Sequence, residues 1–109
     1  DVEQFEVASM APSQVQPVVP GTAMAPAFGH IFSGGYAAGY YGYKWAEVLE
    51  ADAFSLFKEK GIFNREVSGS FRENILSKGG TEHPMELYVR FRGHNPETKA
   101  LIEKMGLGK

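Results

Sequence analysis

Polar side chains that could take part in chemistry are concentrated in residues 28–45, a stretch rich in glycine and tyrosine. This stretch holds four of the five tyrosines and one of the three histidines of the 109-residue chain. Tyr36, Tyr40 and Tyr43 are spaced i, i+4 and i+7, and this spacing places three phenols along one side of a helix. We therefore expect a tyrosine face on a helix that begins near Tyr36, with His30 shortly before it.

On residue chemistry alone, this tyrosine face has three interpretations. It could be a packed aromatic layer, a stacking platform for sugars or bases, or a set of hydrogen-bond donors aimed at a bound polar group. Aromatic residues on helices usually belong to the core, which favours the first interpretation. However, a phenol is a donor that stays neutral near pH 7, which suits a carbonyl oxygen that becomes negative during a reaction. The residues alone leave the three interpretations open.

Other kinds of site are poorly matched by the sequence. The three histidines, His30, His83 and His94, are isolated from one another and none lies in an HExxH motif, so we expect no complete zinc site in this chain. Ser33 precedes a glycine pair but forms neither a Gly-x-Ser-x-Gly nucleophile motif nor a P-loop, which would need a lysine. We interpret Ser33 as a turn residue.

The composition is that of an ordinary globular domain. Hydrophobic residues make up 43% and charged residues 22% of the chain, which disfavours wholesale disorder. The formal net charge is −2 and there is no basic block, which argues against nucleic acid and anionic membranes as partners. No apolar run approaches the ~20 residues that span a bilayer. The absence of cysteine excludes disulfides and thiolate metal sites and is compatible with a reducing compartment.

The elements that would position the polar residues all have helical patterns, so we predict an all-α fold. Residues 1–11 are expected to form a short amphipathic helix capped by Asp1. Residues 12–35 hold four of the six prolines and are expected to form an extended, ordered Pro/Gly-rich connector, with a mobile linker as the alternative. Residues 36–60 show the longest helical pattern, which Gly61 would end. Residues 61–109 are expected to form several short helices.

The helical periodicity also predicts a buried face and the caps of the later helices. At ~100° per residue, one arc of the long helix carries the expected core residues. These are Trp45, Ala46, Leu49, Ala53, Leu56 and Phe57. Asn64 is expected to cap the next helix, Thr81 or Glu82 to start the following one, and Asn95 with Pro96 to start the last.

Several short motifs of the chain occur together in one protein family. They are Gly21-Thr22, Phe28-Gly29-His30, Gly34-Gly35-Tyr36, the run from Tyr40 to Val48, Gly61-Ile62-Phe63-Asn64, the run from Ile75 to Thr81, and Pro84-Met85-Glu86-Leu87. Together they closely resemble the C-terminal part of the thimet oligopeptidase family of zinc metallopeptidases, which includes oligopeptidase A and peptidyl-dipeptidase. The resemblance covers nearly the whole chain.

The resemblance implies that the chain is the C-terminal segment of a larger, mostly helical, two-lobed enzyme that hydrolyses peptide bonds in short peptides. Zinc in that parent enzyme would be bound by an HExxH motif and a glutamate located ahead of Asp1, so this chain alone would be inactive. Its partners would be short peptides and the rest of the parent catalytic domain. A cytoplasmic location is expected, with the periplasm as an alternative. Endopeptidase and dipeptide-releasing activities both remain open.

The resemblance also implies roles for individual residues. His30 would contact the substrate backbone near the scissile bond, and Tyr43 would donate to the carbonyl oxygen as it becomes an oxyanion. These two residues are the catalytic candidates. Tyr36 is implied in substrate or transition-state contact, and Tyr40 is a further substrate-binding candidate.

Gly34 and Gly35 would complete the substrate site as a hinge that lets the loop close on a peptide and reopen. A function of another class is a stand-alone helical interaction module without catalytic activity. In that case a face of small residues would receive a partner helix. This face consists of Gly35, Ala38, Gly39 and Gly42. Apolar faces that should pack on absent parent helices also leave dimerisation of the isolated chain open.

Overall fold

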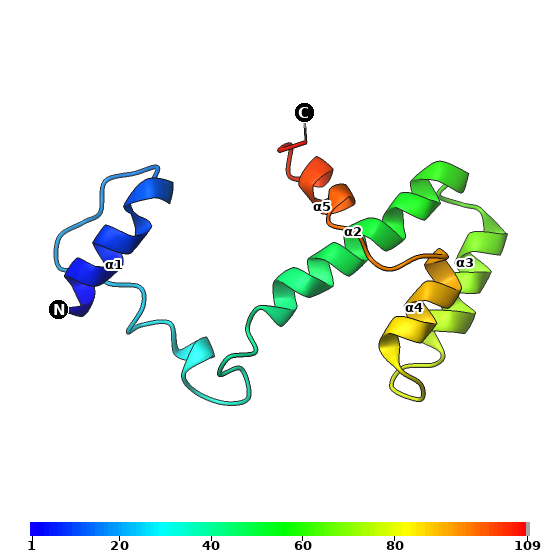
Figure 1. The fold of residues 1–109 in the computed structure, drawn as a ribbon, viewed down its shortest axis with the longest axis horizontal. Coiled ribbons are helices and arrows are strands. Elements are labelled where there is room, and N and C mark those ends of the chain that lie inside the picture. The colour runs from blue at the N-terminus through cyan, green and yellow to red at the C-terminus, as the bar shows by residue number, and fades with distance from the viewer. Residues whose placement is uncertain (109) are drawn as a thin grey trace. The chain divides into compact units, whose positions relative to one another are not determined.

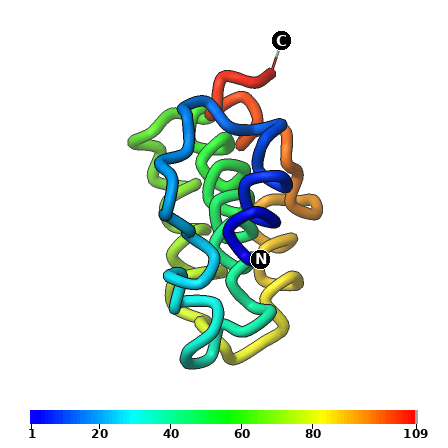
Figure 2. Tube along the Cα trace, turned by 90° about the vertical axis from the view of Figure 1, so that its left-hand side faces the viewer, coloured from blue at the N-terminus to red at the C-terminus, as the bar shows by residue number. Residues whose placement is uncertain are grey.

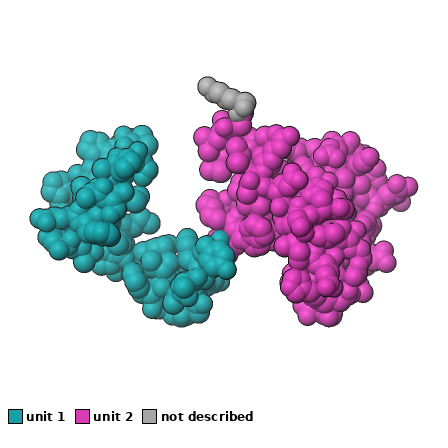
Figure 3. All heavy atoms as spheres, viewed as in Figure 1, with its two compact units in different colours: residues 1–41 teal, residues 42–109 magenta. Residues whose placement is uncertain are grey.

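The computed structural model describes residues 1–108, and every regular element among them is a helix (Figure 1). The predicted all-α class is therefore confirmed. The chain divides into a first compact unit, Asp1–Tyr41, and a second unit that begins at Gly42 (Figure 3). Lys109, the last residue of the predicted range 61–109, lies outside the described residues.

The first unit contains helix α1, Val2–Met10, and a connector that returns beside it (Figures 1 and 2). Asp1 caps α1 as predicted, because its Oδ1 accepts from the N–H of Glu3 at 2.9 Å. The α-helix ends at Met10, and a single 3₁₀ turn, Ala11–Ser13, follows with proline in its first positions.

Two glutamates of α1 hold the returning connector. Glu3 Oε1 accepts from the backbone N–H of Gly21 at 2.9 Å. The two carboxylate oxygens of Glu6 accept from the N–H groups of Met24 and Ala25, at 2.8 and 2.6 Å. These backbone donors lower the pKa of the Glu6 carboxyl below its usual value, because they favour the charged form.

The second unit is built on α2, Gly42–Lys60, the longest helix. Gly61 follows it with a φ of +103° and ends it as predicted. The next helix, α3, is capped by Asn64 as predicted. The remaining elements are α3 (Arg65–Phe71), a π-helical segment (Arg72–Leu76), α4 (Pro84–Arg92) and α5 (Lys99–Lys104).

The core of the second unit lies between α2, α3 and α4. Its buried cluster consists of Ala53, Val67, Tyr88 and Phe91. Phe57 and Phe71 pack against this cluster from α2 and α3, and the rings of Phe71 and Phe91 meet edge to face with centroids 5.1 Å apart. Phenylalanine rings thus connect the three helices.

Helix α2 begins at Gly42, later than the predicted start at Tyr36. Residues 36–41 form turns instead. Ala38 has a φ of +56°, a left-handed conformation that cannot belong to a right-handed helix, and the glycines around it lower helix propensity. The predicted tyrosine face on a single helix is therefore wrong, and so is the helical face of small residues that would have received a partner helix.

The buried arc of α2 differs in part from the prediction. Four predicted positions are buried or partly buried, namely Leu49, Ala53, Leu56 and Phe57. Trp45, however, is 43% exposed, and Ala46 is exposed as well. Helix α5 packs on α2 as well. The other buried residues of α2 are Val48, Ala51 and Asp52.

The cap of α4 is His83 rather than Thr81 or Glu82. Its ring Nδ1 accepts from the N–H of Met85 at 3.2 Å. Pro84 occupies the first helical position and has no N–H, so the first backbone donor that needs a partner is the one His83 reaches.

Helix α5 begins at Lys99. The predicted start at Asn95 and Pro96 is therefore wrong. An N-cap carbonyl accepts the first bond within its helix. The carbonyl oxygen of Asn95 instead lies 2.6 Å from His94 Nδ1. Thr98, the residue before Lys99, is the N-cap instead, and its carbonyl accepts from the N–H of Ile102 at 3.0 Å.

Candidate functional site

His30 lies in a cluster of aromatic rings in the first unit. It belongs to the 3₁₀ turn Gly29–Ile31. The centroid of its imidazole ring is 4.8 Å from that of Tyr36 and 5.4 Å from that of Tyr40, both edge to face. Phe28 completes the cluster, with its ring 4.9 Å from that of Tyr40. The structure thus brings together three predicted site residues.

The cluster is open to solvent. Tyr36 is 42% and Tyr40 is 37% exposed, and His30 is exposed as well. A neutral imidazole carries one donor and one acceptor nitrogen, and a phenol hydroxyl can donate or accept. The cluster thus combines side chains of the donor and acceptor kinds that pair with carbonyl and N–H groups.

The loop that joins His30 to Tyr36 is shaped by Ser33 and Gly34. The backbone N–H and the hydroxyl of Ser33 both donate to the carbonyl of Gly29, at 2.7 and 2.8 Å, which confirms Ser33 as a turn residue. Gly34 has a φ of +88°, a conformation that favours glycine. A Cβ added at Gly35 would meet no atom within 4 Å. The hinge role of this glycine pair stays a prediction.

A second turn sets the spacing of the two phenols. The N–H of Gly39 donates to the carbonyl of Tyr36 at 2.9 Å. Ala38, inside this turn, is the non-glycine residue with a positive φ among those described. Such a conformation costs an alanine about 1 kcal/mol or more. The turn therefore places Tyr36 and Tyr40 beside His30 without the helix that the sequence predicted.

Tyr43, the fourth predicted aromatic site residue, lies in the second unit. It occupies the first turn of α2, and its side chain is 45% exposed. The N-terminal turn of a helix has unpaired N–H groups and a partial positive charge. No acidic residue lies in this turn to neutralise that charge. The surroundings of Tyr43 thus favour negative charge on a bound group.

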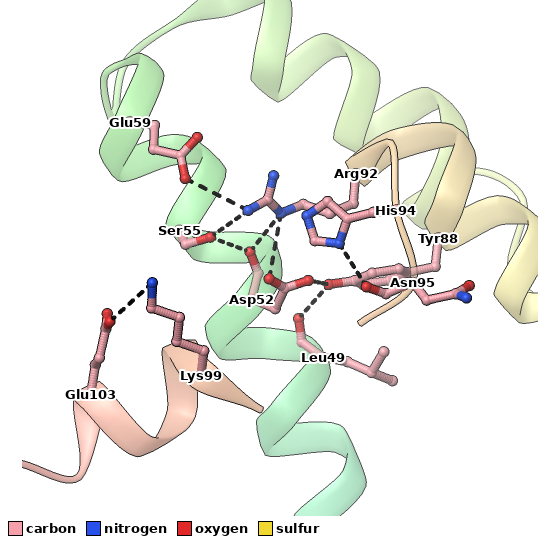
Figure 4. A network of polar contacts seen from close by, with 10 residues as sticks. All are labelled: Leu49, Asp52, Ser55, Glu59, Tyr88, Arg92, His94, Asn95, Lys99 and Glu103. Atoms are coloured by element: carbon pink, nitrogen blue, oxygen red, sulfur yellow. Dashed lines mark hydrogen bonds and ion pairs between the residues drawn. The ribbon is translucent and has the colours of Figure 1, made fainter. Parts of the chain in front are cut away.

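One polar network in the second unit was not predicted (Figure 4). Asp52 is only 3% exposed, and the Tyr88 hydroxyl donates to its Oδ2 at 2.5 Å. From α4, Arg92 Nε donates to the backbone carbonyl of Asp52 at 3.0 Å, and Arg92 Nη2 donates to Ser55 Oγ at 2.8 Å. Burial first, and then the bond to Asp52, raise the pKa of Tyr88 above its ordinary value.

This network joins α2 to α4 and leaves its members paired. No buried side-chain nitrogen or oxygen within the described part of the chain lacks a hydrogen-bond partner. We therefore assign Asp52, Tyr88 and Arg92 a structural role. The sequence carried one sign of it, because Tyr88 and Arg92 are spaced i, i+4 and so share a face of one helix.

The candidate metal ligands of residues 1–108 do not gather into a zinc centre. Across residues 1–108, no three histidine, cysteine, aspartate or glutamate side chains are grouped as metal ligands, whereas a structural zinc takes four ligands and a catalytic zinc three. Within the same residues, no helix is both long and apolar enough to cross a membrane.

Comparison with known proteins supplies the family. Residues 3–107 match the family model for Peptidase family M3. The chain belongs to peptidase family M3. The resemblance to oligopeptidases that the sequence motifs indicated is thereby confirmed.

Relatives of this M3 chain carry the names of two kinds of peptidase. It is 63% identical over 81 residues to oligopeptidase A of Escherichia coli strain K12, a match that covers 74% of this chain and 12% of the relative. Identity to the probable cytosolic oligopeptidase A of Arabidopsis thaliana is 46% over 99 residues, or 87% of this chain and 14% of the relative. Identity to the dipeptidyl carboxypeptidase of Escherichia coli strain K12 is 39% over 108 residues, or 98% and 16%. The chain therefore spans only a small share of its relatives' length.

Proposed function

We propose that this M3 chain is part of a longer peptidase that hydrolyses short peptides, in which it binds the peptide and stabilises the carbonyl oxygen of the bond being cleaved. The observation that carries the proposal is the family match over residues 3–107, which includes the exposed ring cluster of His30, Tyr36 and Tyr40. The relatives' names support peptides as the substrate class.

In this proposal Tyr43 is the oxyanion donor. Its phenol is neutral near pH 7, so it can donate to a carbonyl oxygen throughout the change from a neutral to a negative group. Its place in the first turn of α2 supports this role, because that end of a helix attracts negative charge. A well-aimed donor of this kind contributes about 3 kcal/mol to the stability of the transition state.

His30, Tyr36 and Tyr40 would hold the peptide backbone. A peptide offers one carbonyl acceptor and one N–H donor per residue, and the ring cluster combines both kinds of partner. His30 would lie nearest the scissile bond. Gly34 and Gly35 would allow this loop to close over the peptide and to open again for product release.

Zinc, which the resemblance implies for the parent enzyme, would activate the attacking water. We propose that its ligands come from parts of the parent outside this chain. The other partner would be the remainder of the catalytic domain, and the expected location is the cytoplasm. By itself the chain would be inactive.

The experiment is the substitution Tyr43→Phe in the parent peptidase, with kcat and KM measured on a short peptide. The loss of one oxyanion donor should lower kcat by roughly ten- to a thousandfold, with little change in KM. Tyr41→Phe is the matched control, since Tyr41 is 73% exposed in the neighbouring turn and has no role in the proposed site. An unchanged kcat in a folded Tyr43→Phe enzyme would contradict the proposal.

A further inference from the structure

The second unit carries an apolar groove on its surface. Helices α2, α3 and α4, with the π-helical segment, line a hollow of about 660 Å³. Its walls include Trp45, Leu49, Phe54, Phe57, Ile62 and Met85. Three of these side chains are well exposed, at 43% for Trp45, 44% for Phe54 and 56% for Ile62. Exposed apolar side chains gathered in one hollow are typical of a surface that another element covers.

The lining of the groove is mostly apolar and does not favour a charged or polar ligand. Among its lining residues Glu50 alone carries a charge, and its carboxylate is already 2.7 Å from Lys104 Nζ. Tyr88 also lines the groove, and its hydroxyl already donates to Asp52. Pockets for small molecules of this size carry a few converging polar groups that fix the ligand. Besides Glu50 and Tyr88, the lining of this groove has one polar side-chain group, the indole N–H of Trp45.

The lengths of the relatives point to the occupant. The matched stretch is 12% of one oligopeptidase A and 16% of one dipeptidyl carboxypeptidase, so most of the M3 protein to which this chain would belong lies elsewhere in sequence. An apolar groove between helices accepts an amphipathic helix through side chains at i, i+3 or i+4, and i+7. A helix of the remaining peptidase can supply such a face.

We propose that this groove is the docking site for an uncharged, apolar face of a helix from the remainder of the parent peptidase. The inference rests on the proposed function, because it takes the chain to be part of that parent. Docking would also fix the start of α2, because Trp45 in the groove wall lies two residues after Tyr43 in the first turn of that helix. The docked helix would thereby help to hold Tyr43, the proposed oxyanion donor, in position.

Thiol accessibility tests this proposal without using activity. The chain contains no cysteine, so Phe54→Cys introduces one thiol into the groove. Ile62→Cys is a second groove variant in case the first fails to fold. Lys58→Cys is the matched control, because Lys58 is exposed on the same helix and does not line the groove. Each variant is made in the 109-residue chain and in the parent, with the unsubstituted parent as background.

We expect the groove thiols to react with a water-soluble thiol reagent at least roughly tenfold more slowly in the parent than in the isolated chain, because a covered thiol reacts only when the cover opens. The control thiol should react at similar rates in both. Equal groove rates in the two proteins would overturn the proposal, and so would equal protection of the control.

Two other occupants give distinct results that would also overturn it. Protection in the isolated chain that grows with its concentration would assign the groove to a second copy. Protection of the parent that appears only after peptide is added would assign the groove to substrate.

The docking proposal and the role of Tyr43 can fail separately. If the groove is protected in the parent but Tyr43→Phe leaves kcat unchanged, the docking site stands and only the role of Tyr43 is removed. If the groove thiols remain reactive in the parent but Tyr43→Phe lowers kcat, the docking site is removed and the role of Tyr43 stands.

Discussion

The two units of this M3 chain use their aromatic residues in opposite ways. In the second unit, Phe91 belongs to the buried cluster, and Phe57 and Phe71 pack against it, so that their rings join three helices. In the first unit no residue is buried, and the rings of His30, Tyr36 and Tyr40 meet edge to face at the surface. Stability is thus concentrated in the second unit. The aromatic rings of the first unit are exposed at its surface, and substitutions should separate these two arrangements.

The largest expected difference is between Phe91→Ala and Phe28→Ala. Phe91 is 6% exposed in the core, so its truncation should lower the free energy of unfolding by about 3–5 kcal/mol. Phe28 belongs to the surface cluster, and its truncation should lower the free energy of unfolding by about 1 kcal/mol, the scale of one aromatic pair. Chemical denaturation followed by circular dichroism measures both. Equal losses would show that the cluster is a structural core.

Tyr88→Phe should have a smaller effect that depends on pH. Removal of the hydroxyl takes one donor from buried Asp52 and should cost about 1–3 kcal/mol near pH 7. Burial raises the pKa of Tyr88 above its ordinary 10, so the native chain keeps this contribution below pH 10 and loses it as the pH rises further. The stability of Tyr88→Phe should therefore fall less steeply above pH 10. Tyr41→Phe, at an exposed position, should retain the steep fall.

The smallest effect is expected at Glu6 in the first unit. Its lowered pKa means that its bonds to Met24 and Ala25 contribute above the ordinary value of 4.5 and weaken as the pH falls below it. Glu6→Gln keeps one acceptor oxygen but cannot titrate. NMR shifts of the Met24 and Ala25 amides should move as the pH falls below 4.5 in the native chain and stay nearly constant in the variant. Identical titrations would rule out the contact.

Local signals explain what the sequence predicted correctly about the fold. Asp1 and Asn64 cap their helices through side-chain oxygens, and Gly61 ends α2 in a left-handed conformation. Each of these features depends on a few neighbouring residues. The class and the helix order follow from such signals, because the helices here are short and mostly begin or end at polar or glycine residues.

The arrangement of the ring cluster and the burial of Asp52 depended on contacts or conformations that a periodic pattern cannot show. The spacing of Tyr36 and Tyr40 fits a helix, but the left-handed Ala38 between them creates a turn that still gathers both rings around His30. Asp52 is buried because Tyr88 and Arg92 reach it from a helix far along the chain. Candidate site residues could be named from the sequence, whereas the turn that brings His30, Tyr36 and Tyr40 together could not be read from it.

The central claim is that Tyr43 recognises the oxyanion, and inhibitor binding tests it most directly. A phosphinic peptide mimics the tetrahedral intermediate, whereas an uncleaved peptide of the same sequence mimics the ground state. In the parent peptidase, Tyr43→Phe should raise the Kd of the phosphinic peptide by about 100-fold and leave that of the ground-state peptide within about twofold, because the donor acts mainly on the transition state. Equal changes in both constants, or no change in either, would contradict the account.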